Sequence, residues 1–234
     1  MKLEQAKKDH YRKLAKAEGY RSRAAFKLKQ LDSKYHLFGR GSVVIDVGCA
    51  PGGWLEVASE VVGDRGLVIG VDLAKVKPIG RKNVKILVQD ITSPSFPSLI
   101  RDALGKGKAD CVLADLSPKL SGIWDMDHFR QIELCNKVVD LLPEILTEGG
   151  SSVMKAFHGS ELDRLVRRLR QSFEQVDVSK PEASRKESSE VYLVSQGFNG
   201  RVVPSSQSES PQEVRPSESL EGSSESDLLD DRLP

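Results

Sequence analysis

The feature that most constrains the fold is a regular alternation of short apolar segments with longer amphipathic ones, which begins at Ser42. Strands are predicted at 42–47, 67–72, 84–88, 110–115 and 151–156, and helices at 53–62, 95–104, 128–146 and 160–171. Short, largely apolar strands that alternate with helices are typical of a parallel sheet covered on both faces. Two more strands, near 173–178 and 190–196, are joined by a link too short and polar for a crossover helix, so one of them is expected to run antiparallel. The sequence therefore predicts a doubly wound, Rossmann-like α/β sheet, mostly parallel with an antiparallel last strand.

Composition divides the 234-residue chain into three parts. Residues 1–40 are interpreted as a basic helical extension, with helices at 2–18 and 23–34 and Ser22 as a candidate N-cap. The first 27 residues hold nine Lys or Arg against three acids, so this part is expected to face a polyanion. Residues 41–200 hold the sheet. Residues 201–234 are rich in Ser, Glu and Pro, carry eight acids against three bases, and are expected to form a disordered acidic tail.

The composition, with 38% hydrophobic and 29% charged residues, is typical of a globular protein. No apolar run approaches the roughly 20 residues that span a bilayer. The charged start "MKLEQAKKDHYRK" lacks the apolar core of a secretory signal, so we expect a cytoplasmic protein without a membrane anchor. Three isolated cysteines argue against a disulfide framework, and neither they nor the histidines have metal-ligand spacing. We therefore expect no metal. The protein is also expected to be a monomer.

The segment "VVIDVGCAPGGW", from Val43 to Trp54, joins the first strand to the first helix of the sheet. In a parallel α/β sheet the ligand binds beyond the carboxyl ends of the strands, where this segment turns. Its glycines let the backbone approach a ligand closely, but their spacing is not the G-x-G-x-x-G of a dinucleotide site. Asp46 precedes the turn, where a carboxylate would repel a phosphate and suit a cation, and Trp54 offers a broad face. The turn is therefore expected to hold a positively charged amino-acid group.

Acidic residues also end the next two strands. Asp72 closes the second strand, the usual place for a carboxylate that binds ribose hydroxyls, and Asp90 follows the third, where it could accept from an adenine amino group. S-adenosylmethionine, a sulfonium with amino-acid, ribose and adenine ends, fits all three acids and is the predicted cofactor. The residues expected to bind it are Asp46, Gly48, Ala50, Pro51, Gly52, Gly53, Trp54, Asp72, Leu73, Asp90, Ile91 and Asp115.

In order and spacing, five blocks of the chain resemble the signature blocks of the FtsJ-type (RrmJ, RlmE-like) ribosomal RNA ribose 2′-O-methyltransferases. They are "YRSRAAFKL", "VIDVGCAPGGW", "VLADLSPKLSG", "SSVMKAFHG" and "SSEVYLVSQGF", and they span about residues 20–198. The resemblance implies a methyltransferase sheet with an antiparallel last strand, S-adenosylmethionine as methyl donor and an RNA substrate.

The resemblance also implies a catalytic Lys-Asp-Lys-Glu tetrad, and the matching positions are Lys27, Asp115, Lys155 and Glu190. A lysine inside the apolar strand "SSVMKAF" costs several kcal/mol unless it is paired, so Lys155 has no low-cost structural explanation. The acceptor hydroxyl must be aligned with the methyl donor and must lose or share its proton. We expect Lys155 to take that proton, with Asp115 and Glu190 orienting the two lysines. Lys29 competes with Lys27 for its role, and Glu187 competes with Glu190.

The resemblance makes a uridine in large-subunit ribosomal RNA the leading acceptor. The tRNA anticodon loop is the alternative, because a related branch of the family shares the tetrad. Among other classes, the intact tetrad disfavours a catalytically silent RNA-binding assembly factor, and the missing G-x-G-x-x-G disfavours a nicotinamide-dependent oxidoreductase.

An RNA partner also accounts for the basic amino-terminal segment, whose lysines and arginines would neutralise phosphates while Tyr11 and Tyr20 stack on bases. The stretch from Ser121 to Cys135, which contains Trp124, is expected to lie over the mouth of the site. It is expected to contribute to acceptor selection.

Overall fold

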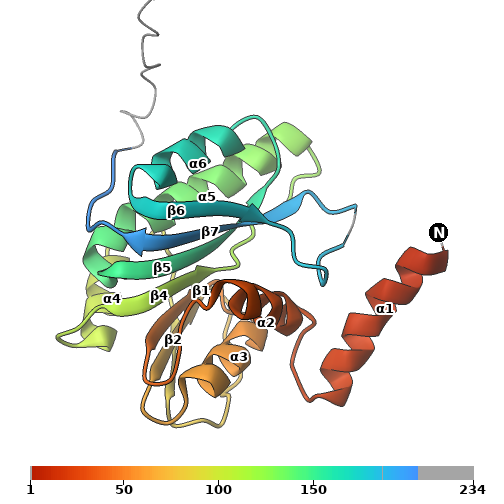
Figure 1. The fold of residues 1–234 in the computed structure, drawn as a ribbon, viewed down its shortest axis with the longest axis horizontal. Helices are drawn as coiled ribbons and strands as arrows, with labels where there is room; N and C mark the ends of the chain where they lie inside the picture. The colour runs from red at the N-terminus through yellow and green to blue at the C-terminus, as the bar shows by residue number, and fades with distance from the viewer. Residues whose placement is uncertain (1, 186, 205–234) are drawn as a thin grey trace, which may run out of the picture.

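The computed structural model describes residues 2–185 and 187–204, and a single seven-stranded sheet organises them (Figure 1). The strands are β1 Val43–Val47, β2 Leu67–Asp72, β3 Val84–Val88, β4 Ala109–Ala114, β5 Leu146–Phe157, β6 Phe173–Ser179 and β7 Glu190–Phe198. The helices are α1 Lys2–Ala17, α2 Ala24–Tyr35, α3 Gly53–Val62, α4 Phe96–Leu104, α5 Trp124–Ile145 and α6 Leu162–Arg170. The predicted acidic tail lies almost wholly outside the described residues.

The strand order is β3-β2-β1-β4-β5-β7-β6. The pairs among β1 to β5 are parallel, whereas β7 lies antiparallel to both of its neighbours, β5 and β6. The chain winds outward in one direction from β1 to β3 and in the other from β4 onward, so the order reverses between β1 and β4. Ligands of doubly wound sheets bind at the carboxyl ends of strands beside such a reversal. The predicted fold class, including the antiparallel last strand, is confirmed.

Two helical layers cover the sheet. α2 and α3 pack on one face, with Leu28 and Leu55 against Val44 of β1. α4, α5 and α6 pack on the other face, where Ile45 is part of the core. Alternate residues of a strand point to opposite faces, so the apolar run of β1 serves both layers. Figure 1 shows this arrangement, with α1 to the side of the sheet and its two helical layers.

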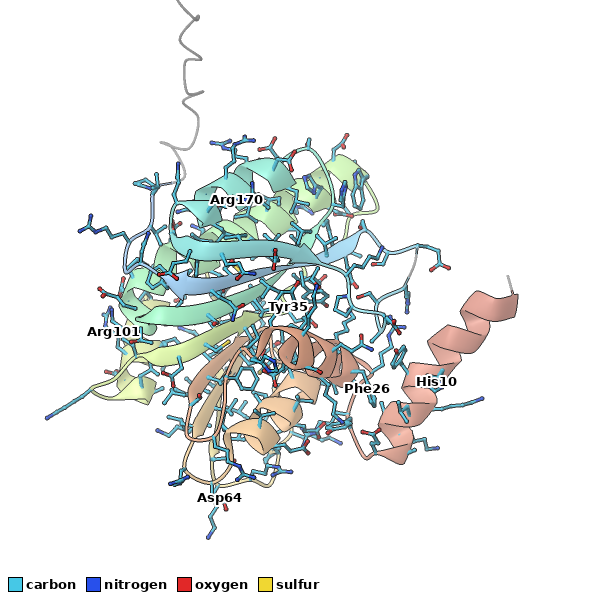
Figure 2. All side chains as sticks on the ribbon, viewed as in Figure 1. His10, Phe26, Tyr35, Asp64, Arg101 and Arg170 are labelled. Atoms are coloured by element: carbon cyan, nitrogen blue, oxygen red, sulfur yellow. The ribbon has the colours of Figure 1, made fainter. Side chains whose placement is uncertain are left out.

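α2 is an integral part of this core. Its residues Ala25, Leu28 and Leu31 are buried together with residues of α3 and the sheet. The predicted boundary at residue 40 therefore separates α2 from the elements on which it packs. α1 contacts the body through Tyr11, whose ring centroid lies 5.7 Å from that of Phe26 on α2; Figure 2 labels Phe26 on the side of α2 that faces α1.

Two local expectations differ from the structure. α2 begins at Ala24 with Arg23 at the N-cap position. The hydroxyl of Ser22, the expected cap, is buried and has no hydrogen-bond partner among the described residues. α5 begins at Trp124 rather than near 128, because acidic residues in its first turn favour a helix start there. The cysteines match their expectation, since Cys49, Cys111 and Cys135 are buried and free. Throughout the described ranges, no helix has both the length and the apolar character needed to cross a bilayer.

Leu28 tests whether α2 belongs to the folding unit. Because its side chain is fully buried, replacing it with alanine opens a cavity under α2 and should lower the free energy of unfolding by about 2–5 kcal/mol. The matched control is Leu73→Ala, an exposed leucine, with an expected change below about 0.5 kcal/mol. Urea unfolding of the ligand-free proteins measures both changes. Equal stability of the two variants would show that α2 is not part of the cooperative unit.

Candidate active site

The four tetrad residues come together as two ion pairs at the carboxyl ends of β4 and β5. Lys27 Nζ lies 3.0 Å from Glu190 Oε2, and Lys155 Nζ lies 3.2 Å from Asp115 Oδ1. Lys155 Nζ also donates to the main-chain oxygen of Asp115 at 3.2 Å. Both lysines are buried, and both carboxylates are partly exposed. The structure thus brings the residues matched from four separate blocks into one cluster.

Strand alternation explains why the side chains meet. Asp115 lies two residues after Leu113, and Lys155 lies two residues after Val153; both apolar residues pack in the α2–α3 layer. Residues two apart in an extended segment share a face, so both tetrad residues turn toward α2. The antiparallel register pairs Lys155 with Tyr192 and Phe157 with Glu190, which brings the start of β7 to the same place.

Tyr192 joins the two ion pairs and was not anticipated from the sequence. Its phenol oxygen accepts a hydrogen bond from Lys27 Nζ at 2.9 Å and donates one to Asp115 Oδ1 at 3.2 Å. A tyrosine inside "EVYLV" looks like an ordinary strand residue, because aromatic side chains are common in strands. Its position two residues after Glu190 was the available signal, since it places both side chains on one face.

Two pKa shifts describe the electrostatics of the cluster. Burial raises the pKa of Tyr192 well above its usual range, and the carboxylates of Asp115 and Glu190 raise it further. The phenol therefore stays protonated at neutral pH and is not a base. Burial alone would raise the pKa of Glu190, but the Lys27 ammonium outweighs it and holds that pKa below the usual range, so Glu190 is an anion.

The structure separates the tetrad residues from their nearest competitors. Lys29 lies on a different side of α2, where its amine pairs with Glu18 at 2.9 Å and sits over the ring of Tyr20. Glu190, rather than Glu187, is the carboxylate in contact with Lys27. Lys27 and Glu190 are therefore the residues that the fold directs into the cluster.

The glycine-rich turn after β1 lies beside the cluster. Gly48 donates to Val71 O at 2.8 Å, and the amide of Ala50 donates to Asp72 Oδ2 at 2.8 Å. Gly48 has φ +78°, and a Cβ there would meet a side-chain carbon of Leu116 at 2.9 Å. The glycine is thus required by the turn and by the loop that follows Asp115, independently of any ligand.

The second half of the turn packs against the start of α2. A Cβ on Gly53 would lie 2.3 Å from Ser22 Oγ, so this glycine permits a close approach within the protein. The ring of Trp54 is buried, donates from Nε1 to Ala24 O at 2.8 Å and packs on Tyr192. The expectation that Trp54 offers its face to a ligand is wrong, because the indole supports the tetrad from within the core. Ala50 and Pro51 are the exposed residues of the turn, whereas Gly52 is buried.

Asp46 is fully buried, and neither carboxylate oxygen has a hydrogen-bond partner in the described part of the chain. Burial raises its pKa well above the usual range, and the charges of Asp115 and Asp72 add to this effect. An unpaired buried carboxyl beside two other acids is unfavourable unless a cation approaches. The acids of this edge therefore fit the ammonium and sulfonium charges of the expected cofactor, while direct contact with Asp46 stays a prediction.

The two other expected acids lie at the ends of the next strands. Asp72 Oδ1 accepts from Ala74 N at 2.8 Å, which leaves lone pairs on both oxygens for ribose hydroxyls. Asp90 Oδ1 accepts from the amide and hydroxyl of Thr92, and these bonds lower its pKa. Leu73 is highly exposed after β2, and Ile91 is partly buried after β3. Their contacts with a cofactor stay predictions.

Arg21, one of the bases expected to face RNA, instead ties the turn to the β2–β3 loop. Its guanidinium donates to Lys77 O at 2.5 Å and to Pro78 O at 2.6 Å. Its Nε donates to Glu56 Oε1 on α3 at 3.0 Å. A side chain from the amino-terminal segment therefore fixes the loop that follows Asp72.

In the described residues, no group of three or more His, Cys, Asp or Glu side chains is arranged to hold a metal ion. The clustered charges at the strand ends are two lysines with their carboxylates, together with Asp46 and Asp72.

Asp46 makes the stability of the ligand-free protein depend on pH. Its raised pKa means that the folded state keeps a proton that the unfolded chain releases above about pH 4, so stability falls as pH rises from there toward the folded pKa. Asp46→Asn should flatten the decline of Tm between about pH 5 and pH 8. The control is Asp64→Asn at an exposed site labelled in Figure 2. A Tm profile of Asp46→Asn parallel to that of the unmodified protein would contradict the assignment.

Comparison with known proteins identifies the family. The FtsJ-like methyltransferase family matches residues 20–198. Ribosomal RNA large subunit methyltransferase E of Methanocaldococcus jannaschii is 45% identical over 199 residues, which cover 84% of this chain and 81% of the relative. The protein of that name from Methanothermobacter thermautotrophicus is 45% identical over 195 residues, 83% of this chain and 92% of the relative.

Solved structures agree with the fold. A Plasmodium falciparum protein assigned as a ribosomal RNA methyltransferase superposes with a TM-score of 0.70 at 30% identity, covering 78% of this chain and 100% of that one. Aeropyrum pernix fibrillarin, at 18% identity and a TM-score of 0.52 over 74% of this chain and 73% of its own, shares the fold. These matches confirm the resemblance found in the sequence and, with it, S-adenosylmethionine-dependent methyl transfer. The chain belongs to the FtsJ-like methyltransferase family.

Proposed function

We propose that the protein methylates the ribose 2′-hydroxyl of a uridine in large-subunit ribosomal RNA. The observation that carries the proposal is the tetrad: two buried ammonium groups and two carboxylates meet at the strand ends beside the glycine-rich turn. The relatives at 45% identity are named for large-subunit ribosomal RNA, which supports the same choice of substrate.

The tetrad divides the work of the reaction. S-adenosylmethionine supplies a methyl group made electrophilic by its sulfonium. The acceptor hydroxyl must lose or share a proton as its oxygen forms the new bond. Lys155, reacting as the neutral amine after its ammonium has lost a proton to solvent, is placed to take that proton. Asp115 holds the Lys155 nitrogen through both its carboxylate and its main-chain oxygen. These two contacts fix the position of the nitrogen relative to the acceptor. Tyr192, kept neutral by burial, connects this pair to Lys27 and is not the proton acceptor.

Lys27 and Glu190 form the second half of the cluster, and we assign this half to the acceptor ribose. Lys27 supplies a positive charge to the site, and Glu190 balances that charge and fixes its position. A positive charge beside the acceptor oxygen stabilises the negative charge that develops there. The proposal therefore assigns proton removal to one lysine and electrostatic stabilisation to the other.

The basic amino-terminal extension, residues 1–40, is proposed to bind the RNA backbone. Arg12 and Lys16 are exposed on α1, which projects from the body (Figure 1). Their charges are suited to phosphates. The tyrosines of this segment have another role: Tyr11 and Tyr20 both pack against Phe26, and Tyr20 donates to Glu60 at 2.6 Å. RNA binding by α1 therefore rests on its cations.

A labelling experiment tests the substrate. The protein is incubated with methyl-labelled S-adenosylmethionine and, separately, with unmodified ribosomal RNA and tRNA, and the alkali-resistant linkage is mapped. Label is expected in large-subunit ribosomal RNA at a uridine ribose. Lys155→Met should lower turnover at least about 100-fold with cofactor affinity retained, whereas Lys85→Met at an exposed site on β3 should leave it unchanged.

Each other outcome of this experiment has a definite meaning. Label in tRNA alone would replace the proposed substrate with the anticodon-loop alternative. Label in neither pool would point to a catalytically silent RNA-binding factor. Near-normal turnover by Lys155→Met would remove Lys155 from the role of proton acceptor.

Tyr192→Phe tests the link between the two ion pairs. The variant keeps the ring but removes a hydrogen bond from Lys27 and one to Asp115, so the two pairs lose their connection. A loss of about 1 kcal/mol per bond predicts that kcat falls about 5- to 30-fold while the KM for the cofactor stays unchanged. Steady-state kinetics at saturating RNA measures both constants, and Tyr35→Phe, at the end of α2, is the control. An unchanged kcat would show that the phenol does not organise the tetrad.

A further inference from the structure

Exposed apolar side chains gather on one short segment beside the site. Among the described residues, eight large apolar side chains are exposed, and five of them fall between residues 120 and 129. The segment follows Asp115 in the chain and includes the first turns of α5. Concentrated apolar exposure of this kind marks a binding surface. Its members are Leu120, Ile123, Trp124, Met126 and Phe129.

Trp124 is connected to the tetrad through Phe157. Its ring stacks on that of Phe157, with centroids 5.9 Å apart and an interplanar angle of 29°. Phe157 ends β5 two residues after Lys155, a separation of about 7 Å along an extended strand, and pairs with Glu190 in the sheet. The indole is nevertheless 46% exposed. A partly exposed aromatic ring therefore lies close to the tetrad.

The position of the indole of Trp124 is fixed by His128. The ring of His128 stacks on it at 6.1 Å, and His128 Nε2 accepts a hydrogen bond from Glu161 N at 3.1 Å. A Cβ on Gly159 would lie 2.6 Å from the imidazole, so the glycine allows the histidine to sit this close to the backbone. Asp127 accepts from the amides of Ser121 at 2.7 Å and Gly122 at 3.0 Å, which ties the preceding loop to α5. A surface that is already rigid loses little entropy when it binds.

The charges around this surface favour a nucleic acid over an apolar protein partner. Lys119 and Arg130 are exposed at the two ends of this segment. Its two acids are Asp125, which is exposed, and Asp127, which is buried and bonded to the amides of Ser121 and Gly122. Near Glu190 and Tyr192, burial lowers the pKa of Arg23, and the charge of Arg185 close by lowers it further. Cations near the tetrad and at the ends of the segment that carries an exposed aromatic ring suit a single strand, whose phosphates they neutralise while a base stacks on the ring.

We propose that Trp124, supported by Phe157 and His128, is a stacking platform for a nucleobase next to the acceptor ribose. The inference rests on the proposed function and deepens it, because it names the part of the substrate that this surface recognises. Stacking on an aromatic ring does not depend on the identity of the base. It requires an exposed base face, so the platform holds a base that is flipped out or unpaired. It therefore favours an acceptor in a single-stranded loop over one in a regular helix.

Tryptophan fluorescence tests binding without any turnover. The chain has two tryptophans, and Trp54 is buried, so the signal that responds to a surface ligand comes from Trp124. The probes are a short oligouridylate and the same strand with an abasic central nucleotide. The complete strand should quench the emission and the abasic strand should quench it less. Trp124→Phe, in which only Trp54 emits, supplies the background.

Kinetics on ribosomal RNA tests the contribution to catalysis. Stacking free energies predict that Trp124→Ala raises the KM for RNA roughly 10- to 100-fold, while kcat at saturating RNA and the affinity for S-adenosylmethionine change little. Trp124→Phe should keep most of the affinity, and Trp124→Leu, which retains an apolar side chain, should lose it. Phe129→Ala is the matched control, because Phe129 is also exposed on α5, at 57%, but makes no ring stack in the described residues. Melting temperatures verify that each variant folds.

The outcomes separate this inference from the proposed function. A normal KM for Trp124→Ala, or equal quenching by the complete and abasic strands, would overturn the platform even if the protein methylates ribosomal RNA. Activity of Trp124→Leu at the level of Trp124→Phe would show that the patch needs apolar volume only, as a protein interface does. Base-dependent quenching with no methylation of any RNA would keep the platform and remove the proposed function.

Discussion

The site depends on the burial of two ammonium groups at one edge of the sheet. A buried lysine is strongly unfavourable unless a carboxylate lies close to it, and here Lys27 and Lys155 each have one within 3.2 Å. These four groups come from α2, from the end of β4, from β5 and from β7. The ion pairs therefore constrain four elements at once, and the same contacts that make burial tolerable also set the geometry of the reaction.

The antiparallel β7 makes this arrangement possible. In a wholly parallel sheet, each strand would begin at the edge opposite the ligand and contribute only its last residues to the site. Because β7 runs the other way, its first residues, Glu190 and Tyr192, lie beside the last residues of β5. Glu190 then meets the amine of Lys27, and Tyr192 spans both pairs. The reversed strand thus adds two polar side chains from its beginning to an edge at which the parallel strands end.

The sequence predicted the sheet well because its strands are short apolar runs separated by clear helical patterns. It left Lys29 as a competitor of Lys27, and the structure separates the two because the amine of Lys29 pairs with Glu18 and that of Lys27 with Glu190. It could not assign the environments of Trp54 and Ser22, because both depend on how closely α2 approaches the glycine-rich turn. Tyr192 was missed for a related reason: its role follows from the register of β5 with β7, which local sequence does not encode.

The contacts of Arg21 limit the length of the β2–β3 loop. The guanidinium of Arg21 donates to the main chain of the β2–β3 loop and to the carboxylate of Glu56 on α3. One side chain therefore holds this loop and α3 together. An insertion that lengthened this loop would move its carbonyl groups out of reach. We therefore expect relatives that keep the arginine to keep the length of the β2–β3 loop. Other surface loops can accept insertions and deletions.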